Sequence, residues 1–177
     1  MEHKILFTGP VGAGKTTAIA SISDIPVVQT EAAASDDVAL RKASTTVAMD
    51  YGTLELDGAV KIHLYGTPGQ ERFSFMWDIL AMGSLGLVLM VDNAREDPLE
   101  DMTLYLKAFE RFIKNNAVVI GVTRMDVKPR PGLYTFQNRL KEMGIKAPVF
   151  EVDARERQDV KQLMQGLLAM LDPGVRR

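Results

Sequence analysis

Several features that would mark a membrane-anchored or secreted protein are missing from this sequence. None of its 177 residues is cysteine, which excludes disulfide bonds, thiolate metal sites and prenyl or palmitoyl anchors. Residue 2 is Glu2 rather than glycine, which excludes N-myristoylation, and a strand-like run begins too early to leave room for a signal peptide. The longest apolar run, Leu85 to Val91, contains Gly86 and is far too short to span a bilayer. We therefore expect a cytoplasmic protein with no direct membrane anchor.

The chain also lacks an excess of positive charge. Lysine and arginine together number 21 against 23 aspartate and glutamate residues, and the formal net charge is −2. Without a basic surface there is little to attract a polyanion, so we expect no nucleic-acid partner. Internal repeats, low-complexity segments and obvious linkers are absent as well. A chain of this length with 46% hydrophobic residues suits one core, and we predict a single domain over residues 1–177.

What the sequence does contain is a glycine-rich loop at residues 9–16, GPVGAGKT, which fits the pattern G-x-x-x-x-G-K-[ST]. A β-prone run precedes it, and residues 17–22 can continue as a helix, whose N-terminus has its own affinity for anions. Glycines let backbone N–H groups face phosphate oxygens, Lys15 adds a cation over the β and γ phosphates, and the Thr16 hydroxyl can bind Mg²⁺. The chain is therefore predicted to bind a nucleoside triphosphate. The predicted phosphate-side residues are Gly9, Val11, Gly12, Ala13, Gly14, Lys15, Thr16 and Thr17.

Strand-like and helix-like segments alternate along the rest of the chain. A turn at Asp57-Gly58 separates two alternating runs, 46–56 and 60–65, which is typical of a β-hairpin. Residues 85–91, 117–122 and 148–152 are typical of buried strands, and helical spacing covers 99–114, 134–143 and 160–171. We predict an α/β fold with a mostly parallel six-stranded sheet, one antiparallel edge strand and helices on both faces. Ligands bind outside the carboxyl ends of the strands in such sheets.

A known family resembles this arrangement. Residues 27–45 have weak periodicity, which indicates a functional or mobile segment, and they are followed by the hairpin and by residues 67–73, TPGQERF. This order resembles the Ras-like small GTPases with their P-loop G domain, over nearly the whole chain. QERF is similar to the Rab and Arf members, and TPGQ is similar to the bacterial gliding-motility-type and roadblock-associated members. The resemblance implies a guanine-nucleotide switch that binds GTP or GDP with Mg²⁺.

The resemblance also implies roles for residues around the phosphates. Lys15 would pair with the β and γ phosphates, and Thr16 would bind Mg²⁺ together with Thr46, the switch threonine, for which Thr45 is an alternative. Gly69 would donate its N–H to the γ-phosphate, and Gln70 would orient the attacking water. Catalysis in this family consists mostly of positioning and charge stabilisation, so few side chains are needed.

Base recognition is expected in the loop after residues 117–122, where the family has N-K-x-D and this chain has Thr123-Arg124-Met125-Asp126. A carboxylate at Asp126 can accept from both guanine N1–H and the 2-amino group, whereas adenine offers no such donor pair. The stem of Arg124 is long enough to cover a flat base. A later loop, Asp153-Ala154-Arg155, resembles the family's S-A-K, and the Ala154 N–H is expected to reach guanine O6.

Two positions depart from the family pattern. Gly66 stands where the family usually has a metal-positioning aspartate, so Mg²⁺ affinity is weaker or another acid, Asp50 or Asp92, acts through water. Val11 adds a side chain to the glycine loop, where it crowds the space that an incoming arginine would use. Slow intrinsic hydrolysis is therefore expected, and Arg41 is a candidate internal arginine.

The predicted helix after Gln70 carries more apolar surface than one buried face needs. Met76, Trp77 and Leu80 lie with Phe73 on one stripe, and a second stripe contains Phe75, Ile79 and Met82. We expect one stripe to pack on the sheet and the other to face outward as a partner surface, with a roadblock-type activator binding the Phe73–Met82 region.

Two other functions remain open from the sequence. One is a nucleotide-dependent protein-binding module with negligible hydrolysis, because Gly66 and Val11 both weaken the catalytic pattern. The other is a P-loop ATPase or kinase, which would need an arginine-rich lid and an acceptor pocket, and the sequence contains neither.

Overall fold

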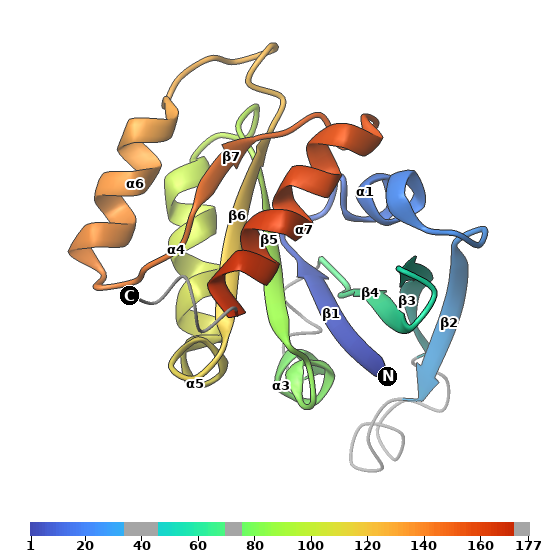
Figure 1. The fold of residues 1–177 in the computed structure, drawn as a ribbon. Helices are drawn as coiled ribbons and strands as arrows, with labels where there is room; N and C mark the ends of the chain where they lie inside the picture. Colours follow the sequence, from blue (N-terminus) through green and yellow to red (C-terminus); the bar gives the residue numbers. More distant parts are fainter. Residues whose placement is uncertain (34–45, 70–75, 172–177) are drawn as a thin grey trace.

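A seven-stranded sheet organises the protein in the computed structural model, which describes residues 1–33, 46–69 and 76–171 (Figure 1). The side chains of residues 30–33 and 46–48 are outside that description. The strands are β1 (Glu2–Thr8), β2 (Val28–Ala33), β3 (Thr46–Leu56), β4 (Val60–Gly66), β5 (Gly86–Asp92), β6 (Ala117–Thr123) and β7 (Val149–Glu151). The helices are α1 (Lys15–Ile22), α3 (Trp77–Ala81), α4 (Pro98–Ala108), α5 (Glu110–Ile113), α6 (Leu133–Glu142) and α7 (Arg157–Leu171).

The strand order is β2-β3-β4-β1-β5-β6-β7, and the pairs from β4 to β7 are parallel. Strand β3 is antiparallel to both of its neighbours, β2 and β4. The predicted α/β architecture is confirmed, but the predicted count of six strands was one too low. The additional strand, β2, was missed because its sequence does not alternate. As an edge strand it pairs only with β3, and Val28 is about half exposed, so little burial constrains its side chains.

The hairpin between β3 and β4 is confirmed. Asp57 and Gly58 have φ of 51° and 66°, so both central residues lie in the left-handed region. Two such residues form the turn whose twist matches that of the flanking strands.

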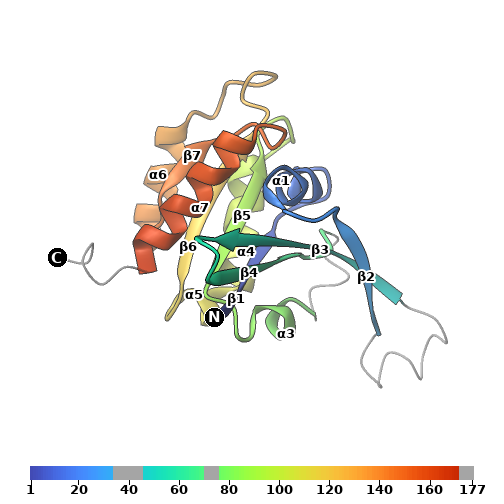
Figure 2. The same ribbon diagram turned by 45° about the vertical axis from the view of Figure 1, so that its right-hand side comes forward.

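Helices cover both faces of the sheet (Figures 1 and 2). Helices α1 and α7 lie on one face, where Ile5 and Phe7 of β1 point into their core. Helices α3, α4 and α6 lie on the other face, to which Leu6 contributes from the same strand. Because successive side chains of β1 point to opposite faces of the sheet, this strand contributes to two separate hydrophobic cores. Every helix of the described residues is too short or too polar to cross a lipid bilayer.

Strands β1, β4, β5, β6 and β7 all run in one direction, so their carboxyl ends share an edge of the sheet. The segments that follow these strands are therefore brought together, as the sequence predicted. They contain the glycine-rich loop, residues 67–69, residues 93–97, residues 124–132 and residues 152–156.

Candidate functional site

The glycine-rich loop connects β1 to α1 and owes its shape to glycines with positive φ. Gly9, Gly12 and Gly14 have φ of 141°, 81° and 98°. A Cβ on Gly9 would lie 2.1 Å from the carbonyl oxygen of Met90, so no other residue fits there. The Ala13 N–H donates to the Pro10 carbonyl at 3.1 Å, which closes the turn ahead of α1. The loop therefore has the curled backbone on which phosphate binding depends.

Lys15 is buried, with only 8% of its surface exposed, and its ammonium group lies within the loop. Its Nζ donates to the carbonyl oxygens of Gly9 and Pro10 at 2.5 and 2.9 Å. Burial lowers the pKa of Lys15 to about 8, and the nearby Asp50 carboxylate opposes that shift. The two carbonyls hold the cation over the concave side of the loop, where the sequence predicted a contact with phosphates.

The segment after β4 lies directly against this loop. A Cβ on Gly69 would lie 2.6 Å from the Val11 backbone nitrogen and 2.7 Å from the Lys15 Nζ, so only glycine can approach this closely. The Tyr105 hydroxyl donates to the Gly69 carbonyl at 2.9 Å, and the Trp77 indole N–H donates to the Pro68 carbonyl at 3.2 Å. Helices α3 and α4 thereby hold residues 68 and 69 beside the glycine-rich loop.

The hydroxyl of Thr16, at the start of α1, donates to the Asp50 carboxylate. Asp50 comes from β3 and is the direct sheet partner of Gly66 at the end of β4. Thr17 is exposed on the same turn of α1. Clusters of three or more acidic or histidine side chains able to hold a metal ion without a ligand's help do not occur within 1–33, 46–69 and 76–171.

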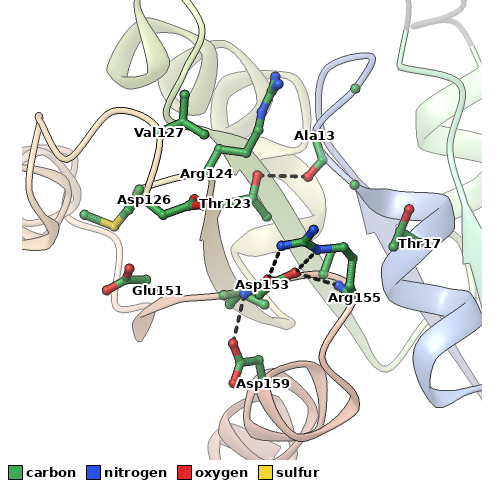
Figure 3. Close-up of a pocket in the computed structure, with 15 residues that line it drawn as sticks. Ala13, Thr17, Thr123, Arg124, Asp126, Val127, Glu151, Asp153, Arg155 and Asp159 are labelled. Carbon is green, nitrogen blue, oxygen red and sulfur yellow. Dashed lines mark hydrogen bonds and ion pairs between the residues drawn. The ribbon is translucent and has the colours of Figure 1, made fainter.

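A cavity of about 750 Å³ extends from the glycine-rich loop to the ends of β6 and β7 (Figure 3). Small-molecule sites typically have volumes of roughly 300–1,000 Å³. The buried Thr123 hydroxyl donates to the Ala13 carbonyl at 3.0 Å, with the Val91 carbonyl at 3.2 Å as a second acceptor. A Cβ on Gly14 would lie 2.9 Å from the Ala154 Cβ. The loops after β6 and β7 are thus packed directly onto the phosphate-side loop.

Arg124 is diverted from the position that the sequence suggested for it. Its guanidinium pairs with the Asp92 carboxylate through two nitrogens, one of them at 2.8 Å, and it points away from Arg155 in Figure 3. The hydrogen bond and charge of Asp92 raise the pKa of Arg124. Its backbone has φ of 57°, which few residues other than glycine adopt. Arg124 nevertheless remains among the residues that line the cavity.

Asp126 follows in the same loop, with its side chain in the wall of the cavity and exposed. Among the described residues no hydrogen bond or ion pair engages its carboxylate. The Asn93 amide holds the loop in place by donating to the Lys128 and Pro131 carbonyls at 2.7 and 3.1 Å. The loop that contains Asp126 is therefore anchored by Asn93, and Asp126 lines the cavity as an exposed carboxylate.

The loop after β7 supplies the opposite wall. The Asp153 N–H donates to Asp159 on α7 at 2.9 Å, and the Asp153 carboxylate accepts from the Arg155 side chain and N–H (Figure 3). Hydrogen bonds from Arg155 lower the pKa of Asp153 to about 2. Ala154 is buried between them. This small turn presents the Ala154 backbone at the base of the cavity.

The structure brings together most of the residues that the sequence singled out. Gly9, Val11, Gly12, Ala13, Gly14, Lys15, Thr16, Thr17 and Gly69 form the phosphate side, and Thr123, Arg124, Asp126, Asp153, Ala154 and Arg155 line the cavity or its rim. Thr46 lies at the first position of β3, and its side chain is not described. Gln70, Thr45, Arg41, Phe73 and Phe75 fall outside the described residues.

The sequence missed some residues of the cavity wall. These are Met125, Val127, Glu151, Val152 and Asp159, of which the first four lie within two residues of predicted positions. Asp159 lies on α7 and faces the site only because it accepts the Asp153 N–H, so the sequence contained no signal for it.

The prediction of two apolar stripes is confirmed for the described residues after position 75. Met76, Trp77 and Leu80 are buried, and Trp77 stacks on Tyr105 and Phe109. Ile79 and Met82 are 55% and 67% exposed.

Comparison with known proteins places this geometry in context. The family described as "Conserved hypothetical ATP binding protein" matches residues 7–174. Ras-related protein RABE1e of Arabidopsis thaliana is 28% identical over 167 residues, which cover 90% of this chain and 70% of that protein. GTP-binding protein YPT1 of Saccharomyces cerevisiae is 25% identical over 131 residues, 72% of this chain and 58% of that protein.

Two further similarities agree with these. Uncharacterized protein MJ1339 of Methanocaldococcus jannaschii is 32% identical over 101 residues, covering 56% of this chain and 57% of that protein. Among solved structures, the G domain of the T. maritima FeoB iron transporter superposes with a TM-score of 0.67 over 97% of this chain and all of that one, at 18% identity. At that identity the superposition shows a shared fold.

Proposed function

The chain belongs to the family of conserved hypothetical ATP binding proteins and is homologous to the Ras-like small GTPases, and from this premise we propose that it is a guanine-nucleotide-binding switch. The observation that carries the proposal is the continuity of one cavity, with the phosphate-type loop at one end and the Asp126 carboxylate at the other. The Thr123–Ala13 hydrogen bond fixes the distance between the two ends. The proposed switch is one domain over residues 1–177.

Guanine is favoured over adenine because of the acceptor at Asp126. Its carboxylate accepts from guanine N1–H and the 2-amino group, while adenine would place an acceptor nitrogen against it. A polar group left unpaired in this way costs about 1–3 kcal/mol. The Arg124 stem covers one face of the base, and the Ala154 N–H donates to O6.

GTP and GDP are held at their phosphates by the glycine-rich loop and by Lys15. The residues at the start of α1, which we call the metal end, fit Mg²⁺. The Thr16 hydroxyl and nearby oxygens are the ligand type that Mg²⁺ prefers. Bound Mg²⁺ supplies positive charge against the β and γ phosphates. Thr46 is the proposed second hydroxyl ligand, in the triphosphate state.

Hydrolysis is proposed to be slow and to depend on few groups. A Cβ on Gly69 would lie 2.6 Å from the Val11 backbone nitrogen. Gly69 is therefore close enough to the glycine-rich loop for its N–H to face a γ-phosphate. Gln70, the next residue, is proposed to orient the attacking water. The Val11 side chain is 57% exposed at the mouth of the loop, where it obstructs an arginine supplied by a partner.

We place the partner surface on the region from Phe73 to Met82. The exposed Ile79 lies on α3, and the exposed Met82 directly follows this helix. The buried face of α3 includes Trp77, whose indole N–H donates to the Pro68 carbonyl. A ligand-dependent change at residues 67–69 is therefore transmitted to this surface. The proposed partner is a roadblock-type activator in a bacterial cytoplasm, by resemblance to the gliding-motility-type and roadblock-associated GTPases.

A second candidate is ATP binding, which the description of the matching family favours. The two are separated by competing GTP, GDP and ATP against a fluorescent GDP analogue bound to the purified chain. We expect GTP and GDP to displace the analogue, and ATP to leave it bound even at about 100-fold higher concentration. Binding sites reject ligands that leave a polar group of the site without a hydrogen-bond partner. Displacement by ATP at equal concentration would contradict the guanine proposal.

Hydrolysis is tested separately. Single-turnover release of the γ-phosphate is measured on the parent and on Gln70→Leu, with Asn116→Ala as a control far from the site. We expect slow release by the parent and by the control, and slower release by Gln70→Leu. Equal rates for all three would show that Gln70 does not orient the water, and no release at all would favour a binding module without hydrolysis.

A further inference from the structure

Strand β4 ends at Gly66, and Asp50 of the neighbouring strand β3 lies beside this glycine. Asp50 on β3 is the sheet partner of Gly66. A Cβ on Gly66 would lie 3.3 Å from the Asp50 Cβ, 3.4 Å from its Oδ2 and 3.2 Å from the Ile19 Cδ1. The Asp50 side chain therefore packs tightly against the place where a side chain at residue 66 would begin.

From this position the Asp50 carboxylate faces the phosphate-side loop. One of its oxygens accepts a hydrogen bond from the Thr16 hydroxyl, the group that the sequence assigns to Mg²⁺. The same carboxylate acts electrostatically on Lys15. Asp50 is half-buried, which limits screening by water. A hydroxyl and a carboxylate converge here beside a phosphate-binding loop, and Mg²⁺ is commonly held by one or two carboxylates together with phosphates.

The other acid that the sequence offered is occupied elsewhere. The Asp92 side chain is 1% exposed and pairs with the Arg124 guanidinium. It also accepts the Ala94 N–H at 3.0 Å. Breaking this arrangement to reach the metal end would leave a guanidinium and a backbone N–H without their partner. Asp92 is therefore part of the base-side frame rather than of the metal end.

We propose that Asp50 supplies, from β3, the carboxylate that positions Mg²⁺ beside Thr16, in place of the acid missing at Gly66. The inference rests on the proposed function, because it presupposes a bound nucleotide and Mg²⁺. The acid comes from the strand that directly follows residues 34–45, whereas Gly66 directly precedes residues 67–69. In this arrangement the acid that positions Mg²⁺ lies next to residues 34–45 in the sequence, and not next to residues 67–69.

The test is the Mg²⁺ dependence of GDP release, which needs no hydrolysis. A fluorescent GDP analogue is loaded, and its release rate is followed across a Mg²⁺ titration for the parent, Asp50→Asn and Glu55→Gln. The asparagine keeps the shape and still accepts from Thr16, and Glu55 is an exposed acid on the same strand. Removing a group that positions a metal typically costs about 10–100-fold in metal affinity. We expect Asp50→Asn to raise the Mg²⁺ midpoint by that factor and Glu55→Gln to leave it unchanged.

A relocation of the acid gives an independent measurement. Asp50→Ala removes the carboxylate, including the oxygen 3.4 Å from a Cβ at residue 66, so Gly66→Asp is added to it and compared with Asp50→Ala alone. Recovery of the Mg²⁺ midpoint toward the parent value supports the proposal. An unchanged midpoint in Asp50→Asn overturns it, whether or not the double variant folds.

The parent separates this inference from the function on which it rests. If GDP release from the parent does not respond to Mg²⁺, or GDP does not bind, the proposed function is contradicted. If the parent responds and Asp50→Asn responds at the same midpoint, the proposed function stands and the role of Asp50 is excluded.

Discussion

The base side of the cavity and the start of α1 depart from the family pattern in different ways. At the base side, Thr123 stands where the family has asparagine, and its hydroxyl donates a hydrogen bond to the Ala13 carbonyl. At the start of α1, Gly66 has no side chain, and the carboxylate that accepts from the Thr16 hydroxyl belongs to Asp50 on a neighbouring strand. A hydrogen bond of the frame is thus made locally, while a charge near the phosphates is supplied from a neighbouring element.

This difference follows from what each group has to do. A bond that joins β6 to the glycine-rich loop must start at the end of β6, because hydrogen bonds require partners within about 3.2 Å. A carboxylate acts through its charge as well as through contacts, so several positions around the same point serve. Where a hydrogen bond of fixed geometry is needed, the substituted residue at the same position has to make it. Where a charge is needed, a residue that is close in space can supply it.

The largest expected effect is that of Lys15→Ala, which removes the cation from the phosphate end alone. Charge-assisted hydrogen bonds contribute about 1.5–3 kcal/mol each, so the loss of two corresponds to at least about 100-fold in affinity. We expect GDP binding measured by calorimetry to fall by that factor or below detection. Lys61→Ala on β4 is the matched control, and circular dichroism checks that both variants fold. Unchanged GDP affinity would contradict a phosphate-binding role for the loop.

Asp126→Asn tests the base end in the same terms. The asparagine amide donates toward the carbonyl that xanthine has in place of the guanine 2-amino group, and its oxygen still accepts from N1–H. We expect GTP affinity to fall by roughly 10- to 100-fold and XTP affinity to rise, because one hydrogen bond is lost and one gained. Competition of GTP, XTP and ATP against a fluorescent guanine nucleotide measures both changes. If the two affinities move together, another residue recognises the base.

Thr123→Val tests whether the frame depends on one hydroxyl. The substitution keeps the shape and leaves the Ala13 carbonyl without its buried donor, which costs about 1–3 kcal/mol. Urea unfolding should show a loss of stability in that range, while Thr135→Val, exposed on α6, should change stability by under about 0.5 kcal/mol. A Thr123 variant as stable as the parent would mean that the two ends are not joined by this bond.

The smallest expected effect is that of Arg155→Ala. Its side chain is 75% exposed, and its ion pair with Asp153 at 2.7 Å is screened by water. Surface pairs of this kind contribute about 0–1 kcal/mol, so stability should change little and guanine affinity should fall by less than tenfold. A larger loss of affinity, measured by the same competition assay, would show that Arg155 contacts the nucleotide directly.

The sequence predicted the fold and named most of the residues that line the cavity, because both depend on local pattern. The glycine-rich loop, the Asp57-Gly58 turn and the apolar strands each have a local physical cause that is visible in a few consecutive residues. Strand β2 was missed because it is stabilised by pairing with β3, and its own residues show no alternation of polar and apolar side chains. The sequence named both Asp50 and Asp92 for the metal end, and only the pairing of β3 with β4, and of Asp92 with Arg124, distinguishes them.

The hydrogen bond between Thr123 and Ala13 also has an entropic consequence. A nucleoside and a pyrophosphate that bind separately each lose translational freedom, whereas a nucleotide loses it once. The covalent tether raises the effective concentration of the second half at its own subsite, and this advantage is largest when the separation of the subsites is fixed. A rigid frame therefore makes the affinity of the whole nucleotide much larger than the product of its fragments' affinities would suggest. Loosening the frame reduces that advantage even where neither fragment binds more weakly on its own.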